Sequence, residues 1–142
     1  MDILTTIPVR LNGPDSIVPL LENVRQRIAR RAYENFIEHG AVYGHDLDNW
    51  LDAEREFIIK PLAETHTEGK DVFVEVIVPK IELTNVAVHV SPRQFVISSD
   101  PDEDGLQLCQ VIDLPVEISL ASVDAEKLDN AIYISAGVAS HD

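Results

Sequence analysis

The side chains that could perform chemistry are few and lie far apart in the sequence. Of the five histidines, only His39 and His45 could approach one another, across a turn that also holds Asp46. Zinc needs three or four converging ligands whose positions are fixed by further hydrogen bonds. Histidines at a helix turn are more often solvated or capping residues. We therefore expect no metal site, and an enzyme with a site at these three residues is the minor alternative.

The single cysteine, Cys109, has the apolar neighbours Leu108 and Val111 in a predicted strand. A nucleophilic thiolate needs a base and an electropositive setting, whereas the charge around Cys109 is negative. Cys109 is therefore predicted to be a buried thiol. Because one cysteine cannot form an intramolecular disulfide, a reducing, cytoplasmic location is the default expectation.

Motifs of nucleotide-dependent and hydrolytic enzymes are missing from the sequence. It contains no glycine-rich phosphate loop, no G-x-S-x-G elbow and no dinucleotide fingerprint. The carboxylates between Asp100 and Asp104 lack the spacing and the distal glutamate of a calcium loop, so a solvated turn is expected there. We predict no catalytic residue, no cofactor and no enzymatic activity.

The charge balance narrows the class of partner. The 142 residues include 11 basic and 25 acidic side chains, a formal net charge of -14 that would repel a phosphate backbone. No apolar run reaches the ~18 residues that a membrane span needs, and residues 1–11 lack the pattern of a secretory signal. We expect protein partners, with neither nucleic acid nor membrane among them.

The first half of the sequence has the period of helices. Apolar residues recur at steps of three and four over residues 16–39, and a second such stripe runs from Asp46 to the stop at Lys60-Pro61. A helical hairpin over residues 16–61 buries too little surface to fold alone, so it must pack against another part of the chain. Its arginines are expected to pair with the acidic second half or with a second protomer: Arg25, Arg27, Arg30 and Arg31.

The second half of the sequence changes to a period of two. Valines alternate with other residues from Val72 to Val78, and five further short apolar segments follow, separated by turn residues. This spacing predicts an antiparallel, immunoglobulin-like β-sandwich over residues 71–142. The predicted fold class is therefore α+β, with an extended arm over 1–15, the helical hairpin, a linker over 62–70 and the sandwich.

The β half resembles the α-crystallin domain of small heat-shock proteins and the related CS co-chaperone domains over residues 71–135. The segments that carry the resemblance are Asp71–Pro79, Val86–Val90, Gln94–Ile97, Ile112–Pro115 and Val123–Ile134. The resemblance implies an ATP-independent chaperone of the bacterial stress response that binds extended apolar segments. The alternative is a CS-like adaptor that recognises one specific folded protein.

Two departures from that family favour the CS-like arrangement. The turn Asp100–Gly105 is far too short for the extra strand that bacterial members exchange between protomers, and the tail after Ser135 has no I-x-I peptide. A separate stretch, residues 31–56, is similar to a small bacterial helical domain of unknown function. Its carriers are Arg31-Ala32-Tyr33-Glu34, Gly40, Gly44-His45-Asp46 and Trp50-Leu51. That second resemblance names no activity.

An I-x-V pattern occurs near the start of the sequence, in Ile7-Pro8-Val9. In an extended backbone Ile7 and Val9 project to one side, and Pro8 stiffens the segment. We hypothesise that this arm docks in a groove between two strands of its own or a neighbouring sandwich. The alternative is a strand or staple that covers the hairpin. The predicted groove residues are Val86, Val88, Val90, Val123, Ala125 and Leu128. Docking on a neighbouring sandwich would make the protein a homo-oligomer.

Overall fold

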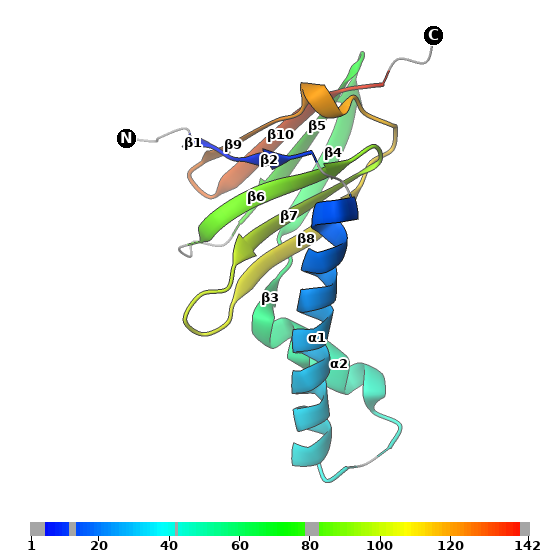
Figure 1. Cartoon of the computed structure of the whole chain (residues 1–142), viewed down its shortest axis with the longest axis vertical. Coiled ribbons are helices and arrows are strands. Elements are labelled where there is room, and N and C mark those ends of the chain that lie inside the picture. Colours follow the sequence, from blue (N-terminus) through cyan, green and yellow to red (C-terminus); the bar gives the residue numbers. More distant parts are fainter. Residues whose placement is uncertain (1–4, 12–13, 42, 79–82, 140–142) are drawn as a thin grey trace.

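The computed structural model describes residues 5–11, 14–41, 43–78 and 83–139. Within them the chain forms a β-sandwich from which two helices project (Figure 1), which confirms the predicted α+β class. In chain order the elements are β1 Thr5–Thr6, β2 Val9–Arg10, α1 Pro14–Glu38, α2 Asp46–Phe57, β3 Ile58–Ile59, β4 Leu62–Glu68, β5 Asp71–Ile77, β6 Thr84–Ser91, β7 Gln94–Asp100, β8 Gln107–Asp113, the 3-10 turn η1 Leu120–Ser122, β9 Asp124–Leu128 and β10 Ala131–Gly137.

The sandwich consists of two five-stranded sheets. One sheet has the order β1-β9-β10-β5-β4 and the other the order β2-β6-β7-β8-β3. Alternate residues of β5 point between the sheets, where Val72 and Val76 are fully buried, as the period-two pattern predicts. Phe95, Leu108 and Ile132 are equally buried between the sheets. This shared apolar layer holds the two sheets together.

Strand β4 corrects the prediction of a linker over residues 62–70. Residues 62–68 pair with β5 along their whole length, from Leu62 opposite Ile77 to Glu68 opposite Asp71. Gly69, with φ of 62°, provides the left-handed residue of the connecting turn. Since β4 lies at the edge of its sheet and exposes nearly every side chain, the alternation that marks a half-buried strand is absent from its sequence.

Two short strands correct the prediction of a purely antiparallel sandwich. β2 pairs in parallel with β6, and β3 pairs in parallel with β8. β3 also shortens the predicted hairpin, because the second helix ends at Phe57 and Ile58 and Ile59 join the sheet. The arm predicted over 1–15 likewise contains β1 and β2, and α1 begins at Pro14.

The helical hairpin packs against the edge of the second sheet, as its small size requires. A second apolar cluster joins Val24 and Ile28 of α1, Ala53 of α2, Ile58 of β3 and Cys109 of β8. Cys109 is a free, buried thiol, and burial raises its pKa. The hairpin and the sandwich therefore share a continuous apolar contact.

The arginines of α1 serve three different parts of the molecule. Arg25 pairs with Glu22 of its own helix, and Arg31 joins the two helices through Glu56, at 2.6 Å. Arg27 reaches the sandwich, where it donates to the side chain of Gln107. No helix in the described ranges is long and apolar enough to cross a membrane.

Candidate functional site

The N-terminal arm lies across the open side of the sandwich, between β9 of one sheet and β6 of the other (Figure 1). Its first part extends the β9 sheet, with Thr5 opposite Lys127 and Thr6 opposite Glu126. The amide of Ile7 donates a 2.9 Å hydrogen bond to the carbonyl of Ala125. This half of the arm is therefore held by main-chain bonds to β9.

After Ile7 the arm changes to the other sheet. The amide of Val88 donates to the carbonyl of Pro8 at 3.0 Å, and Val9 and Arg10 then run parallel to β6, opposite Val88 and His89. Pro8 suits the crossing point because its φ is restricted to the extended range and it has no N–H to satisfy. A single extended segment thus connects the edges of both sheets.

The two apolar side chains of the arm point to the same interior. Ile7 is 4% exposed and belongs to the main core, and Val9 packs at the margin of that core. Burying an isoleucine of this kind contributes about 1.5–3 kcal/mol. The arm therefore lies against the open side of the sandwich and contributes the Ile7 side chain to its core.

The six predicted groove residues differ in their relation to the arm. Val88 and Ala125 hold it by main-chain hydrogen bonds, while Val90 and Val123 are buried in the core and Val86 and Leu128 are half-buried. Sequence reasoning missed Glu126 and Lys127, which pair with the arm through their backbones. No side-chain signal marks such positions, because backbone pairing is independent of residue type.

A histidine of β6 lies beside the arm. His89 of β6 is 3.0 Å from the hydroxyl of Ser98 through its Nε2 and stands opposite Arg10 of the arm. Burial and, to a smaller extent, the positive charge of Arg10 lower the pKa of His89. Protonation of His89 therefore opposes the docked arrangement.

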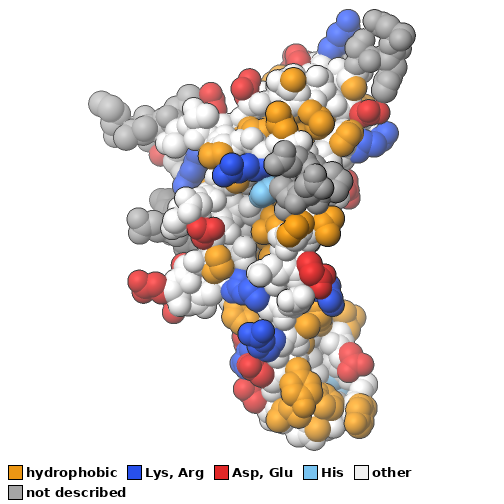
Figure 2. All heavy atoms as spheres, in the orientation of Figure 1, with side chains coloured by type: hydrophobic (Ala, Val, Ile, Leu, Met, Phe, Trp, Pro, Cys, Tyr) orange, Lys and Arg blue, Asp and Glu red, His pale blue; other side chains and the backbone are white. Residues whose placement is uncertain are grey.

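A second surface lies on the hairpin, at the end farthest from the sandwich (Figure 2). Tyr43, Leu47 and Tyr33 are 86%, 68% and 65% exposed, and Phe36 contacts both tyrosine rings, at centroid distances of 6.3 and 5.5 Å. A hollow of about 430 Å³ runs between these rings and Trp50. Exposed aromatic patches of this kind are typical of protein interfaces.

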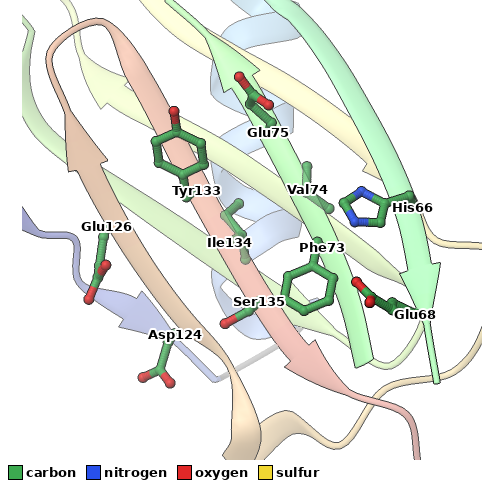
Figure 3. A pocket seen from close by; sticks show the side chains of 10 residues that line it. All are labelled: His66, Glu68, Phe73, Val74, Glu75, Asp124, Glu126, Tyr133, Ile134 and Ser135. Atoms are coloured by element: carbon green, nitrogen blue, oxygen red, sulfur yellow. The ribbon is translucent and has the colours of Figure 1, made fainter. Parts of the chain in front are cut away.

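A third concave surface lies on the outer face of the β4–β5–β10–β9 sheet (Figure 3). Its hollow of about 510 Å³ is lined by His66, Phe73 and Tyr133 and by carboxylates on both sides, and the rings of His66 and Phe73 stack at 5.2 Å. The outer face of this sheet is therefore aromatic and acidic.

The histidines considered for metal binding lie on the hairpin. His39 and His45 line a hollow of about 320 Å³ together with Asp48 and Asp52, and His45 Nδ1 is 3.5 Å from Asp48. Among the residues that the structure describes, no three histidine, cysteine or carboxylate side chains are arranged to hold a metal ion.

Comparisons with known proteins give a family model for the hairpin and a group of solved structures for the sandwich. The family model "Protein of unknown function (DUF2934)" matches residues 24–57. This range includes residues 31–56, the stretch whose sequence resembles a helical domain of unknown function. The sequence matches no curated protein.

Three of the similar solved structures are heat shock proteins. A Del-C4 mutant of hsp14.1 from Sulfolobus solfataricus is 19% identical, with a TM-score of 0.50, over 62% of this chain and 82% of that chain. The A102D mutant of the same protein is 15% identical, with a TM-score of 0.50, over 68% and 91%. Heat shock protein 16.0 from Schizosaccharomyces pombe is 15% identical, with a TM-score of 0.49, over 59% and 91%. The similarity to the two Sulfolobus structures shows that the sandwich of this chain has the fold of the small heat shock proteins.

Proposed function

We propose that the protein is an ATP-independent chaperone of the small heat-shock type, in which the groove between β6 and β9 binds extended apolar segments of unfolding proteins. The observation that carries the proposal is the arm itself. An extended Ile-Pro-Val segment lies in this groove, with main-chain hydrogen bonds to Ala125 and Val88 and an isoleucine side chain in the core.

Recognition of this kind suits unfolded clients. Main-chain hydrogen bonds depend little on the client's sequence, and the apolar interior selects one aliphatic side chain every second residue. The formal charge of -14 keeps the resulting complexes soluble. A client must displace the arm, whose two strands have only two residues each, and short strands with few contacts open at low cost in free energy.

A peptide-binding experiment tests the proposal. The probe is a fluorescent peptide with the sequence of residues 3–11, and the variant Ile7→Ser/Val9→Ser weakens the docked arm. We expect this variant to bind the peptide at least about tenfold more tightly than the unaltered protein, because the groove is vacated. The matched control is Leu11→Ser, since Leu11 is exposed. A second peptide has serine at both apolar positions. The proposal would be contradicted if all three proteins bound the two peptides with the same affinity.

A client assay tests the chaperone activity separately. Heated citrate synthase is the client, and light scattering measures its aggregation without nucleotide. We expect suppression by the unaltered protein and stronger suppression by Ile7→Ser/Val9→Ser. No suppression by either protein, with the peptide still bound, would leave a peptide-binding groove without chaperone activity.

The exposed aromatic patch on the hairpin favours a second candidate function, that of a CS-like adaptor. In that case Tyr33, Tyr43 and Leu47 recognise one folded partner. The variant Tyr33→Ser/Tyr43→Ser would then abolish the capture of one protein in stoichiometric amount from a lysate, while Ile7→Ser/Val9→Ser would not. For the chaperone we expect the opposite: many captured proteins and dependence on the arm.

A further inference from the structure

Strand β4 is the long open edge of the sandwich. Within the described residues, each of the other three outermost strands, β1, β2 and β3, has two residues, whereas β4 has seven. One side of β4 pairs with β5. The N–H and C=O groups on its other side have no strand beside them in the described part of the chain, and such a row is a template for another strand.

The sequence of β4 lacks three common devices that protect a sheet edge, and its charged residues are the two glutamates Glu64 and Glu68. Residues 62–68 contain no proline, no lysine and no bulge against β5. Ala63 is half-buried and the other six residues are exposed. Its two threonines, Thr65 and Thr67, favour extended backbone. A partner strand can therefore approach β4 along its whole length.

We propose that a second copy of this chain occupies this edge, with the two β4 strands antiparallel and Thr65 opposite Thr65. Pairing over residues 62–68 forms about six to eight new main-chain hydrogen bonds. It joins the two β1-β9-β10-β5-β4 sheets into one continuous sheet, with the two-fold axis through the Thr65 pair. This inference is independent of the chaperone proposal, because the arm groove lies at the opposite edge.

Charge complementarity selects this register. Residues that face each other in an antiparallel pair point to the same face of the sheet. In a symmetric pair of two identical strands, the facing residues must therefore be an even number of positions apart. The two-fold axis consequently passes between two copies of the same residue. With the axis at Thr65, Glu64 of each copy faces His66 of the other. An imidazole N–H can donate to a carboxylate, and the pair occurs twice. Ala63 then faces Thr67, and all seven residues are paired.

The two neighbouring registers are electrostatically worse. With the axis at Glu64, two glutamates face each other, and five residues pair. With the axis at His66, Glu64 faces Glu68 twice. Like charges directly opposite one another destabilise a sheet, so both alternatives are disfavoured relative to the Thr65 register.

The surroundings of His66 are compatible with this role. Its ring stacks on Phe73, which keeps it on the outer face of β4 (Figure 3). The charged groups around it are Glu64 and Glu68 on β4 and Glu75 and Asp71 on β5. The acidic residues of β9 lie three strands away, about 14 Å, which exceeds the Debye length of about 8 Å in physiological salt. The acidic residues of β9 in either copy therefore add little repulsion between the two β4 strands.

Cysteine cross-linking tests the proposed register. Facing residues in an antiparallel pair have Cα atoms about 4.5–5.5 Å apart, within the range of a disulfide. We expect Thr65→Cys to form a covalent dimer under mild oxidation. Ala63→Cys alone should not, but a mixture of Ala63→Cys and Thr67→Cys should. The unaltered chain is the control, since Cys109 is buried. Self-cross-linking of Glu64→Cys or His66→Cys, with none at Thr65, would overturn the register.

A charge swap tests the energetic basis by sedimentation equilibrium. We expect His66→Glu, which places two glutamate pairs at the interface, to raise the dimer dissociation constant by roughly tenfold. The double variant Glu64→His/His66→Glu exchanges the partners and should restore it, a result that a merely structural role of His66 would not give. Near-UV circular dichroism confirms folding. A monomer at every concentration up to about 0.5 mM, or failure of the folded double variant to recover dimerisation, would overturn the proposal.

Discussion

Nη1 of Arg27 lies 2.5 Å from Oε1 of Gln107, across a separation of 80 residues. The same guanidinium donates to the carbonyl of Gly105 at 2.6 Å and lies over the ring of Phe57, 5.2 Å from its centroid. The amide of Gln107 in turn donates to the carbonyl of Ser99. A cation of α1 therefore connects the hairpin to two strands of the second sheet.

The first prediction concerns this contact. Arg27→Ala leaves the partly buried oxygens of Gln107 and Gly105 without their charged donor, so we expect it to lower the free energy of unfolding by about 2–3 kcal/mol. Arg25→Ala is the matched control, because Arg25 pairs with Glu22 in an exposed position on the same helix and should change stability by less than about 0.5 kcal/mol. Urea unfolding measures both, and equal effects of the two substitutions would contradict the assignment.

The second prediction uses Cys109 as a reporter of hairpin docking. This thiol is buried where β8 meets α1 and α2, and burial raises its pKa. Both effects slow alkylation, because the thiolate is the reactive form. We expect iodoacetamide to react much more slowly than with a free thiol, and faster in Arg27→Ala. Alkylation of the unaltered protein at the rate of an exposed cysteine would show that the hairpin does not stay docked.

The third prediction concerns the arm. Ile7→Ala removes most of a buried side chain from the main core. We expect one of two results: the free energy of global unfolding falls by about 2–4 kcal/mol, or the arm alone detaches and becomes exposed to solvent. Hydrogen exchange distinguishes these results through the amide of Ile7, which donates to Ala125. Leu11→Ala, at an exposed position, should leave both stability and exchange unchanged. Exchange of the Ile7 amide in the unaltered protein at the rate of an unstructured peptide would contradict the docked arrangement.

The fourth prediction is a pH dependence. Because the pKa of His89 is lowered in the folded state by burial and by Arg10, the neutral form stabilises the docked arrangement. This contribution is complete above the unfolded pKa, about 6.5, and is lost as the pH falls from there through the lowered folded pKa. We expect His89→Gln to flatten this part of the stability profile, measured by thermal unfolding between pH 7.5 and 5. His39→Gln, at an exposed position, should keep the slope of the unaltered protein.

The fifth prediction concerns Gly105. Its φ is +84°, and a Cβ there would lie 3.1 Å from Nη2 of Arg27. Gly105→Ala therefore combines a left-handed backbone with a displaced guanidinium, and we expect a loss of about 1–3 kcal/mol. Gly69→Ala is the control, with a φ of +62° but nothing near its Cβ, so it should lose only the backbone part. An equal loss in both would show that the contact with Arg27 contributes nothing.

The sequence alone predicts the strands that have one buried face. In β5 the alternating valines predict both the strand and the residues that enter the core, because a period of two is intrinsic to extended backbone. The extended arm is also predicted, because the I-x-V spacing of Ile7-Pro8-Val9 places two apolar side chains on one side of an extended backbone. The hairpin is predicted by its helical period, and its need of a support follows from its size.

Only the tertiary structure shows the strands that are defined by hydrogen bonds to a neighbouring strand rather than by a pattern in their own sequence. β4 shows no period because both of its faces meet solvent, and β2 and β3 are two-residue strands held by β6 and β8. The arm's change of sheet at Pro8 depends on where two distant sheet edges come to lie. The residue types and their periods thus determine which segments are helical, extended or apolar. Which edges remain open and what lies beside them depends on backbone hydrogen bonds between distant strands, and these bonds carry no side-chain signature in the sequence.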